Sequence, residues 1–344
     1  MNLGLGNQKT KLMTDLIFHI GLPKCGSSTL QRSVFRHEDG YLGTEPDIAP
    51  ELNMAKQLQK CAPFAGRQTI NRKGLRGWAD CVRSIKQERW PNIDRLILSN
   101  EMLSSASRLS ERPMIKVLSL LRQRFWTEGD IKVVLVLRNQ AARLASSYAQ
   151  GAGFRLKPGQ ADFERSVERS LNSRRHLRLF DYSRWIEGLE SVAGPENFCV
   201  LLLEESRTVE FWQQLAGFCR LERSEPETMI LPNTSKKNVR SRSADRWSIS
   251  EFDPAVRAKV MVDKWLNAFW PTRLQSGLRD QLRQKTIAQL ETRYRRKAEQ
   301  IPDGRRETEF HLSPQVMETV RARCGSFNAR LGEQLGRDLE PLGY

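Results

Sequence analysis

The sequence predicts an α/β fold of three layers, in which a central, mainly parallel sheet is flanked by helices. Three observations predict it. Apolar runs of strand length recur along the chain, segments of helical periodicity separate them, and the first run leads into a glycine-bearing loop that opens a helix. Alternating strands and helices favour a parallel sheet, because parallel neighbours need a crossover connection that is usually helical.

Four apolar runs are the strand candidates, at residues 16–20, 96–98, 133–137 and 198–203. The run at 133–137 is uninterrupted, which is typical of a strand buried on both faces. Between the runs, apolar residues recur at spacings of three and four, which places them on one face of a helix. They are Met114, Val117, Leu118, Leu121 and Phe125, and later Leu144 and Tyr148.

The C-terminal part is predicted to be mostly helical from about Asp253 onward, and it is rich in Arg and Gln. Its basic cluster at residues 293–297 is interpreted as a solvated helix face. No clean linker divides the chain, so we expect one domain over residues 1–344. Its core would cover about residues 15–240, and a helical C-terminal extension would cover about residues 250–344.

Composition narrows the partners and the compartment. The chain has 344 residues and a net charge of +16, which suits an anionic partner. Its 6 cysteines form no C-x-x-C pair and it has only 4 histidines, which argues against a structural zinc site and a dense disulfide framework. No signal-peptide pattern and no apolar run of about 20 residues is present. We expect a cytoplasmic protein without a membrane span.

The most informative segment is residues 19–31, which read HIGLPKCGSSTLQ. A strand, a glycine loop and a helix start form an anion cradle, because free backbone N–H groups, here those of residues 25–28, and the helix dipole face the ligand. A Walker loop has its lysine after the second glycine. Here Ser27 follows Gly26, and the loop lysine is Lys24. A plain glycine turn before a capped helix remains the alternative.

Polar residues follow three of the strand candidates, where ligands of parallel sheets bind. The first strand leads to the Lys24 loop, the second ends at residues 99–101, and the third ends at Arg138. Ser146 follows eight residues after Arg138, on the next helix. A guanidinium and a hydroxyl at that separation can grip one phosphate from two sides. An arginine that caps or pairs locally is the open alternative.

These motifs resemble those of the sulfotransferases that use 3′-phosphoadenosine 5′-phosphosulfate (PAPS). Residues 23–28 are similar to the family's 5′-phosphosulfate loop, although Cys25 stands where Ser or Thr is commoner. Arg138 and Ser146 fit its 3′-phosphate element, with Gln140 where proline is frequent. The resemblance covers about residues 15–240 and implies a P-loop-like fold, PAPS as co-substrate and PAP as product, with no metal. Golgi-type members usually carry a membrane anchor, and no apolar run of that length is present here. The resemblance therefore implies a soluble, bacterial-type member.

The resemblance also implies a nucleotide-binding set. It comprises Lys24, Cys25, Gly26, Ser27, Ser28, Thr29, Arg138, Ser146, Lys237 and Arg240, the last two in a basic loop at residues 233–240. Lys24 would stabilise the departing phosphate oxygen. A general base would take the acceptor's proton.

For that base Glu101 is the first choice. Glu45 is the second, since residues 43–46 resemble a glutamate–proline segment of glycan sulfotransferases, and His37 and His19 come third. We expect the acceptor to be a small molecule or a glycan, and a carbohydrate is favoured.

Other functions stay open at this stage. A P-loop nucleotide kinase or phosphotransferase is one, although the lysine after the second glycine is missing. A basic nucleic-acid-binding protein is another, although no helix-turn-helix, zinc-finger or aromatic RNA-binding motif is found and no nucleic acid is expected as a partner. A catalytically dead nucleotide sensor is a third. The sequence leaves the oligomeric state and the identity of the acceptor open.

Overall fold

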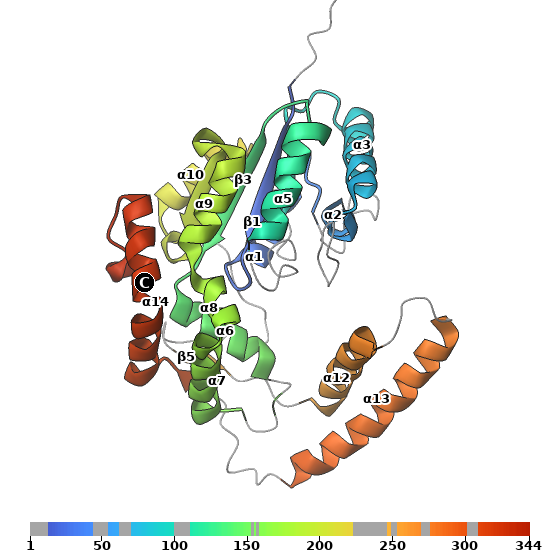
Figure 1. Ribbon diagram of the computed structural model, residues 1–344, viewed down its shortest axis with the longest axis vertical. Coiled ribbons are helices and arrows are strands. Elements are labelled where there is room, and N and C mark those ends of the chain that lie inside the picture. Colours follow the sequence, from blue (N-terminus) through green and yellow to red (C-terminus); the bar gives the residue numbers. More distant parts are fainter. Residues whose placement is uncertain are drawn as a thin grey trace, which may run out of the picture. The chain divides into compact units, whose positions relative to one another are not determined.

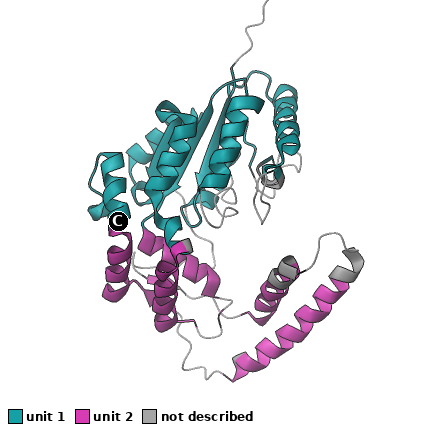
Figure 2. Ribbon diagram, viewed as in Figure 1, with its two compact units in different colours: residues 1–139, 175–233, 326–344 teal, residues 140–174, 234–325 magenta. Residues whose placement is uncertain are grey.

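The structure is a computed structural model of the 344-residue chain. It describes residues 13–43, 54–61, 70–99, 111–152, 155, 158–222, 246–248, 253–269, 276–300 and 309–344. The chain divides into two compact units (Figure 2). Unit 1 comprises residues 1–139, 175–233 and 326–344, and unit 2 comprises residues 140–174 and 234–325.

Unit 1 holds a four-stranded parallel sheet of order β2-β1-β3-β4. The strands are β1 (Asp15–Gly21), β2 (Arg95–Ser99), β3 (Ile131–Leu137) and β4 (Phe198–Leu202). All four predicted strands are thereby confirmed. In β1, β2 and β3 nearly every residue is buried, which explains why these strands show unbroken apolar runs rather than alternation.

The helices of unit 1 follow the strands of the sheet along the chain (Figure 1). They are α1 (Ser27–Ser33), α2 (Met54–Cys61), α3 (Arg72–Arg89), α5 (Arg112–Leu120), α9 (Tyr182–Ala193) and α10 (Val209–Cys219). Short turns are η1 (Phe35–His37), η4 (Leu121–Phe125), η5 (Arg178–Phe180), η6 (Pro195–Asn197), η7 (Leu203–Glu205) and η9 (Glu340–Leu342). The predicted face from Met114 to Phe125 is buried along α5 and the π-helical turn η4 that continues it.

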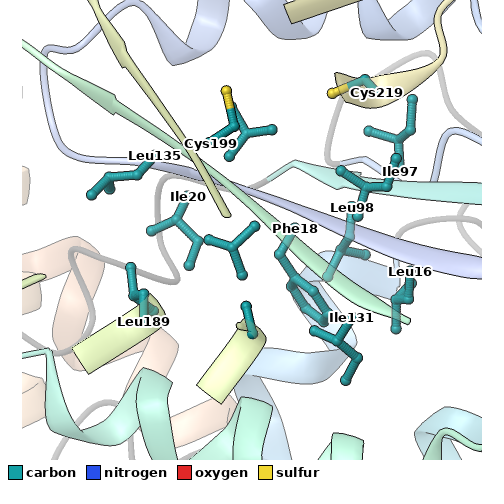
Figure 3. Packing of buried hydrophobic residues seen from close by; sticks show 14 of the residues in the cluster. Leu16, Phe18, Ile20, Ile97, Leu98, Ile131, Leu135, Leu189, Cys199 and Cys219 are labelled. Atoms are coloured by element: carbon teal, nitrogen blue, oxygen red, sulfur yellow. The ribbon is translucent and has the colours of Figure 1, made fainter. Parts of the chain in front are cut away.

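The core of unit 1 lies on both faces of the sheet (Figure 3). Phe18 and Ile20 of β1 are fully buried on the side of Leu189 from α9. Cys199 of β4 lies on the side of Cys219 from α10. Successive strand residues point to opposite faces, so a sheet covered on both faces buries every position and makes a three-layer fold.

Unit 2 is built from helices and one small ribbon. Its elements are α6 (Gln140–Ala152), α7 (Gln160–Asn172), β5 (Arg246–Ser248), α12 (Pro254–Phe269), α13 (Ser276–Glu299), β6 (Glu309–His311) and the first part of α14 (Pro314–Leu335), while α8 (Arg174–Leu177) begins in this unit. The antiparallel β5–β6 ribbon pairs Trp247 with Phe310. Phe310 also packs on Tyr148 and Phe163, with its ring centroid 4.8 and 4.5 Å from theirs, so an aromatic cluster joins α6, α7 and β6.

Candidate active site

The sheet order marks where a ligand site should lie. The chain runs from β1 to β2 on one side and then returns to place β3 on the other side of β1. In open parallel sheets, ligands bind outside the carboxyl ends of the strands at such a switch point. The residues that follow β1 and β3 here are the Lys24 loop and Arg138, which are the two segments singled out in the sequence.

The loop after β1 is a tight, strained turn. The Cys25 N–H donates to the Leu22 carbonyl across 3.1 Å. Lys24 and Gly26 both have left-handed backbones, with φ of 70° and 79°. For a residue with a side chain this conformation costs about 1 kcal/mol or more, and such costs concentrate at functional sites. Residues 25–28 were all expected to offer an open amide; this is wrong for Cys25, whose N–H closes the turn.

Both loop glycines are required by close contacts. A Cβ atom on Gly21 would overlap Ser27 Oγ, so the Ser27 side chain fills the space that a residue other than glycine would need. A Cβ on Gly26 would lie 2.7 Å from Leu203 Cδ1, in addition to the positive φ. The two glycines therefore let α1 begin directly against the end of β1 and the η7 turn.

The three hydroxyl residues that open α1 point differently. Ser27 is 2% exposed, and its Oγ has no hydrogen-bond partner among the described residues. Ser28 is exposed and Thr29 is half-buried. No side chain caps the helix and its first turn holds no acidic residue. Because first-turn N–H groups have no partner within a helix, the amides of Ser27 and Ser28 remain for an anion.

Arg138 reaches the loop from the end of β3. Its Nη1 donates to the Lys24 carbonyl across 3.2 Å. The Tyr182 hydroxyl in turn donates to the Arg138 carbonyl across 2.7 Å, which fixes the backbone from which the guanidinium extends. The loop and Arg138 therefore lie together at one edge of the sheet. A guanidinium has five N–H donors, so one bond to the loop leaves others for a ligand.

A half-buried carboxylate, that of Glu204, holds the turn after Arg138. Glu204 Oε1 accepts from the Asn139 backbone N–H at 2.9 Å and from Asn139 Nδ2 at 3.1 Å. Glu204 Oε2 accepts from the Tyr344 hydroxyl at 3.1 Å. Burial raises the pKa of Glu204. Burial, and then the charge of Glu204, raises the pKa of Tyr344 well above its ordinary value.

This Glu204 network is not evident from the sequence, because its members lie 65 and 140 positions apart. Glutamate after a strand and a tyrosine near the end of the sequence give no pattern that could have identified them.

A comparison with protein-family models decides the family. The model described as "Sulfotransferase domain" matches residues 14–302. The chain belongs to the sulfotransferase family. The match includes the Lys24 loop, Arg138 and Glu204, and family membership supports sulfuryl transfer as the activity of this enzyme. A comparison with curated protein sequences gives no match.

Two solved structures are similar to this sulfotransferase. A sulfotransferase from Alicyclobacillus acidocaldarius is 16% identical with a TM-score of 0.41, over 95% of this chain and 98% of the other. The sulfotransferase domain of the olefin synthase of Synechococcus PCC 7002 is 13% identical with a TM-score of 0.36, over 83% of this chain and 96% of the other. The family assignment rests on the domain match.

The remaining predicted site residues of the sulfotransferase fall in different places. Ser146 is half-buried in α6 of unit 2, whereas Arg138 belongs to unit 1, so their joint grip on a phosphate stays a prediction. Four predicted residues lie outside the described part of the chain: Glu45, Glu101, Lys237 and Arg240.

The two histidines considered as bases differ sharply. His37 is exposed in η1. His19 is fully buried, and burial lowers its pKa to about 3. A group with that pKa does not take up a proton near neutral pH. His19 is therefore unsuited to act as the general base of the sulfotransferase.

Among the residues that the structure describes, no group of three or more His, Cys, Asp or Glu residues is arranged to hold a metal ion. Of the helices in the described part of the chain, none has the length and apolarity to cross a membrane.

Proposed function

We propose that this sulfotransferase moves the sulfuryl group of PAPS to a hydroxyl or amine of an acceptor, with a carbohydrate as the favoured acceptor. One observation carries the proposal. The Arg138 guanidinium contacts the Lys24 carbonyl, so the two segments that resemble the 5′ and 3′ phosphate elements of the family meet at one edge of the sheet. A nucleotide with phosphate groups at both ends needs two such neighbouring elements.

The residues present fit such a nucleotide. The Lys24 loop combines two left-handed residues with an uncapped helix start, and successive amides in this arrangement form a concave anion site. Ser28 and Thr29 add hydroxyls that are not buried. PAPS, when bound, supplies an activated sulfuryl group on its 5′-phosphate.

Each residue then has one task. The Lys24 amine and the amides of Ser27 and Ser28 stabilise the negative charge that develops on the phosphate oxygen as the sulfuryl group leaves. Arg138, with Ser146, holds the 3′-phosphate, and Lys237 and Arg240 complete this grip. Glu101, or else Glu45, accepts the acceptor's proton.

Cysteine chemistry supports a cytoplasmic location. None of the six cysteines, all of which belong to the described residues, forms a disulfide. Thiols that remain reduced suit the cytoplasm, where we propose that the enzyme works.

The test is a binding titration followed by a transfer assay. PAP should bind without metal and more tightly than ATP with magnesium, and transfer from labelled PAPS to a panel of sugars, phenols and alcohols identifies the acceptor class. Arg138→Ala should weaken PAP binding by about 2–4 kcal/mol, the scale for losing a desolvated charged contact. Arg124→Ala is the matched control, since Arg124 is exposed in η4, before the opposite end of β3. Equal PAP affinity in both variants would refute the role of Arg138.

A further inference from the structure

A chain of hydrogen bonds is buried beneath the loop, and nothing in the proposed function uses it. Gln31 Nε2 of α1 donates to Ser99 Oγ across 3.1 Å. Ser99 Oγ lies 2.6 Å from His19 Nδ1. All three side chains are at least 95% buried, because their exposed fractions are 5%, 0% and 0%.

These hydrogen bonds join three elements that end or begin at the site. His19 and Ser99 are register partners on neighbouring strands, and Ser99 is the last residue of β2. Gln31 belongs to α1, whose first turn follows the loop. His19 precedes Gly21 by two positions, so it lies on the same face of the sheet, with its Cε1 3.4 Å from where a Gly21 Cβ would stand.

The imidazole is neutral and is held through Nδ1. Burial lowers the pKa of His19 to about 3. Ser99 Oγ accepts from Gln31 and makes one hydrogen bond with His19 Nδ1, whose direction depends on the ring tautomer. His19 Nε2 has no hydrogen-bond partner among the described residues, so either tautomer leaves at least one buried polar atom unmatched.

Three buried polar side chains contribute little to the stability of the core. Apolar residues of similar shape would be equally or more stable, since burying paired polar groups gains little net free energy. Directional hydrogen bonds, however, fix distance and angle, whereas apolar contacts tolerate sliding. These hydrogen bonds therefore fix the position of the loop relative to the end of β2, rather than adding to the stability of the fold.

We propose that Gln31, Ser99 and His19 are positioning residues that hold the end of β2 in register with the Lys24 loop. This proposal rests on the proposed function, in which the loop holds PAPS and Glu101, two positions after Ser99 in the sequence, accepts the acceptor's proton. A misplacement of about 1 Å between reacting groups lowers turnover by as much as about 100-fold. Loss of these hydrogen bonds therefore lowers kcat, while the binding of PAPS to the loop persists.

Two substitutions of His19 test the roles of its two ring nitrogens separately. His19→Asn keeps a hydrogen-bonding atom at the place of Nδ1, because the amide atoms of asparagine are attached to Cγ as Nδ1 is. His19→Gln carries its amide at the place of Nε2 and loses the hydrogen bond with Ser99. We expect His19→Asn to retain most of the wild-type kcat and His19→Gln to lose about 10- to 100-fold, with the affinity for PAP unchanged in both.

Substitutions of Ser99 give the second, independent arm. Ser99→Ala removes the hydroxyl and should lower kcat by about 10- to 100-fold, whereas Ser99→Thr keeps it and should restore most of the rate. Thermal melting and PAP titration accompany every variant. Any His19 variant that fails to fold leaves the alanine–threonine pair to decide.

The outcomes separate this proposal from the proposed function. A wild-type protein that neither binds PAP nor transfers from PAPS refutes both. A wild-type enzyme that transfers, with Ser99→Ala turning over at the same rate, refutes the positioning role alone. So does a parallel loss of PAP affinity and kcat in Ser99→Ala and Ser99→Thr alike, because that pattern belongs to general disruption of the core.

Discussion

Lowering the pH tests whether His19 is buried as a neutral imidazole. The perturbation is a shift from about pH 7.5 to about pH 5. In the folded protein burial lowers the pKa of His19 from 6.5 to about 3, while in the unfolded chain the ring keeps its ordinary value. Between these values the unfolded chain binds a proton that the folded protein excludes. The stabilisation is complete above the unfolded pKa and is lost as the pH falls through this window.

The magnitude follows from the two pKa values. A pH of about 5 lies about 1.5 units below the pKa of the unfolded imidazole and about 2 units above the pKa of the folded one. The unfolded ring is then protonated and the folded ring is neutral, so the free energy of unfolding falls by about 2 kcal/mol. The result changes little for any folded pKa below about 4, because the buried ring is then neutral at about pH 5 in every case.

Urea unfolding followed by tryptophan fluorescence at both pH values measures the effect in the wild type and in His19→Asn. The three other histidines, at positions 37, 176 and 311, are present in both proteins, so their contributions cancel. We expect the wild type to lose about 2 kcal/mol more than the variant. Equal losses would refute the burial of a neutral imidazole at position 19.

Three further predictions concern the loop and its support. Lys24→Ala and Lys24→Gly should both abolish transfer. In urea unfolding, Lys24→Gly should be more stable than Lys24→Ala by about 1 kcal/mol, because glycine adopts the positive φ without strain. Equal stability of the two variants would contradict this strain. Gly21→Ala should cost about 1–3 kcal/mol in thermal unfolding, and Ser27→Gly should recover part of it unless the overlap is not the cause. Glu204→Ala should destabilise by about 1–3 kcal/mol and weaken PAP binding, because Asn139 loses its acceptor, whereas Glu204→Gln should retain both, and a PAP titration on the two variants decides.

The fold was predictable from the sequence because its signals are local and strong. Strands buried on both faces must be apolar throughout, and all four predicted runs are strands of the sheet. The β5–β6 ribbon escaped prediction because each strand has only three residues, too few for any periodicity to show. Its stability comes instead from aromatic contacts with segments distant in the sequence.

The site was predictable only in part, and the reason is geometric. The motif identified Lys24 and Arg138, but three consecutive hydroxyl residues give no sign that Ser27 turns inward and Ser28 outward. That division depends on Gly21, whose missing side chain leaves the space that Ser27 fills. The partners that support the site, Glu204 among them, likewise become evident only when segments that are distant in the sequence are brought together.

Arg138 links these observations, since its contacts serve the loop as well as a ligand. Its bond to the Lys24 carbonyl supports a residue whose left-handed backbone is unfavourable by itself, and the Tyr182 hydroxyl and Glu204 fix the turn from which the arginine extends. The shape of the loop therefore depends on a residue just after β3 and on residues of α9 and η7, as well as on its own glycines. A substitution of Arg138 acts on both elements at once. The pair Lys24→Ala and Lys24→Gly isolates the loop's share of PAP affinity, because both variants lack the amine and differ in the strain of the positive φ while the arginine remains.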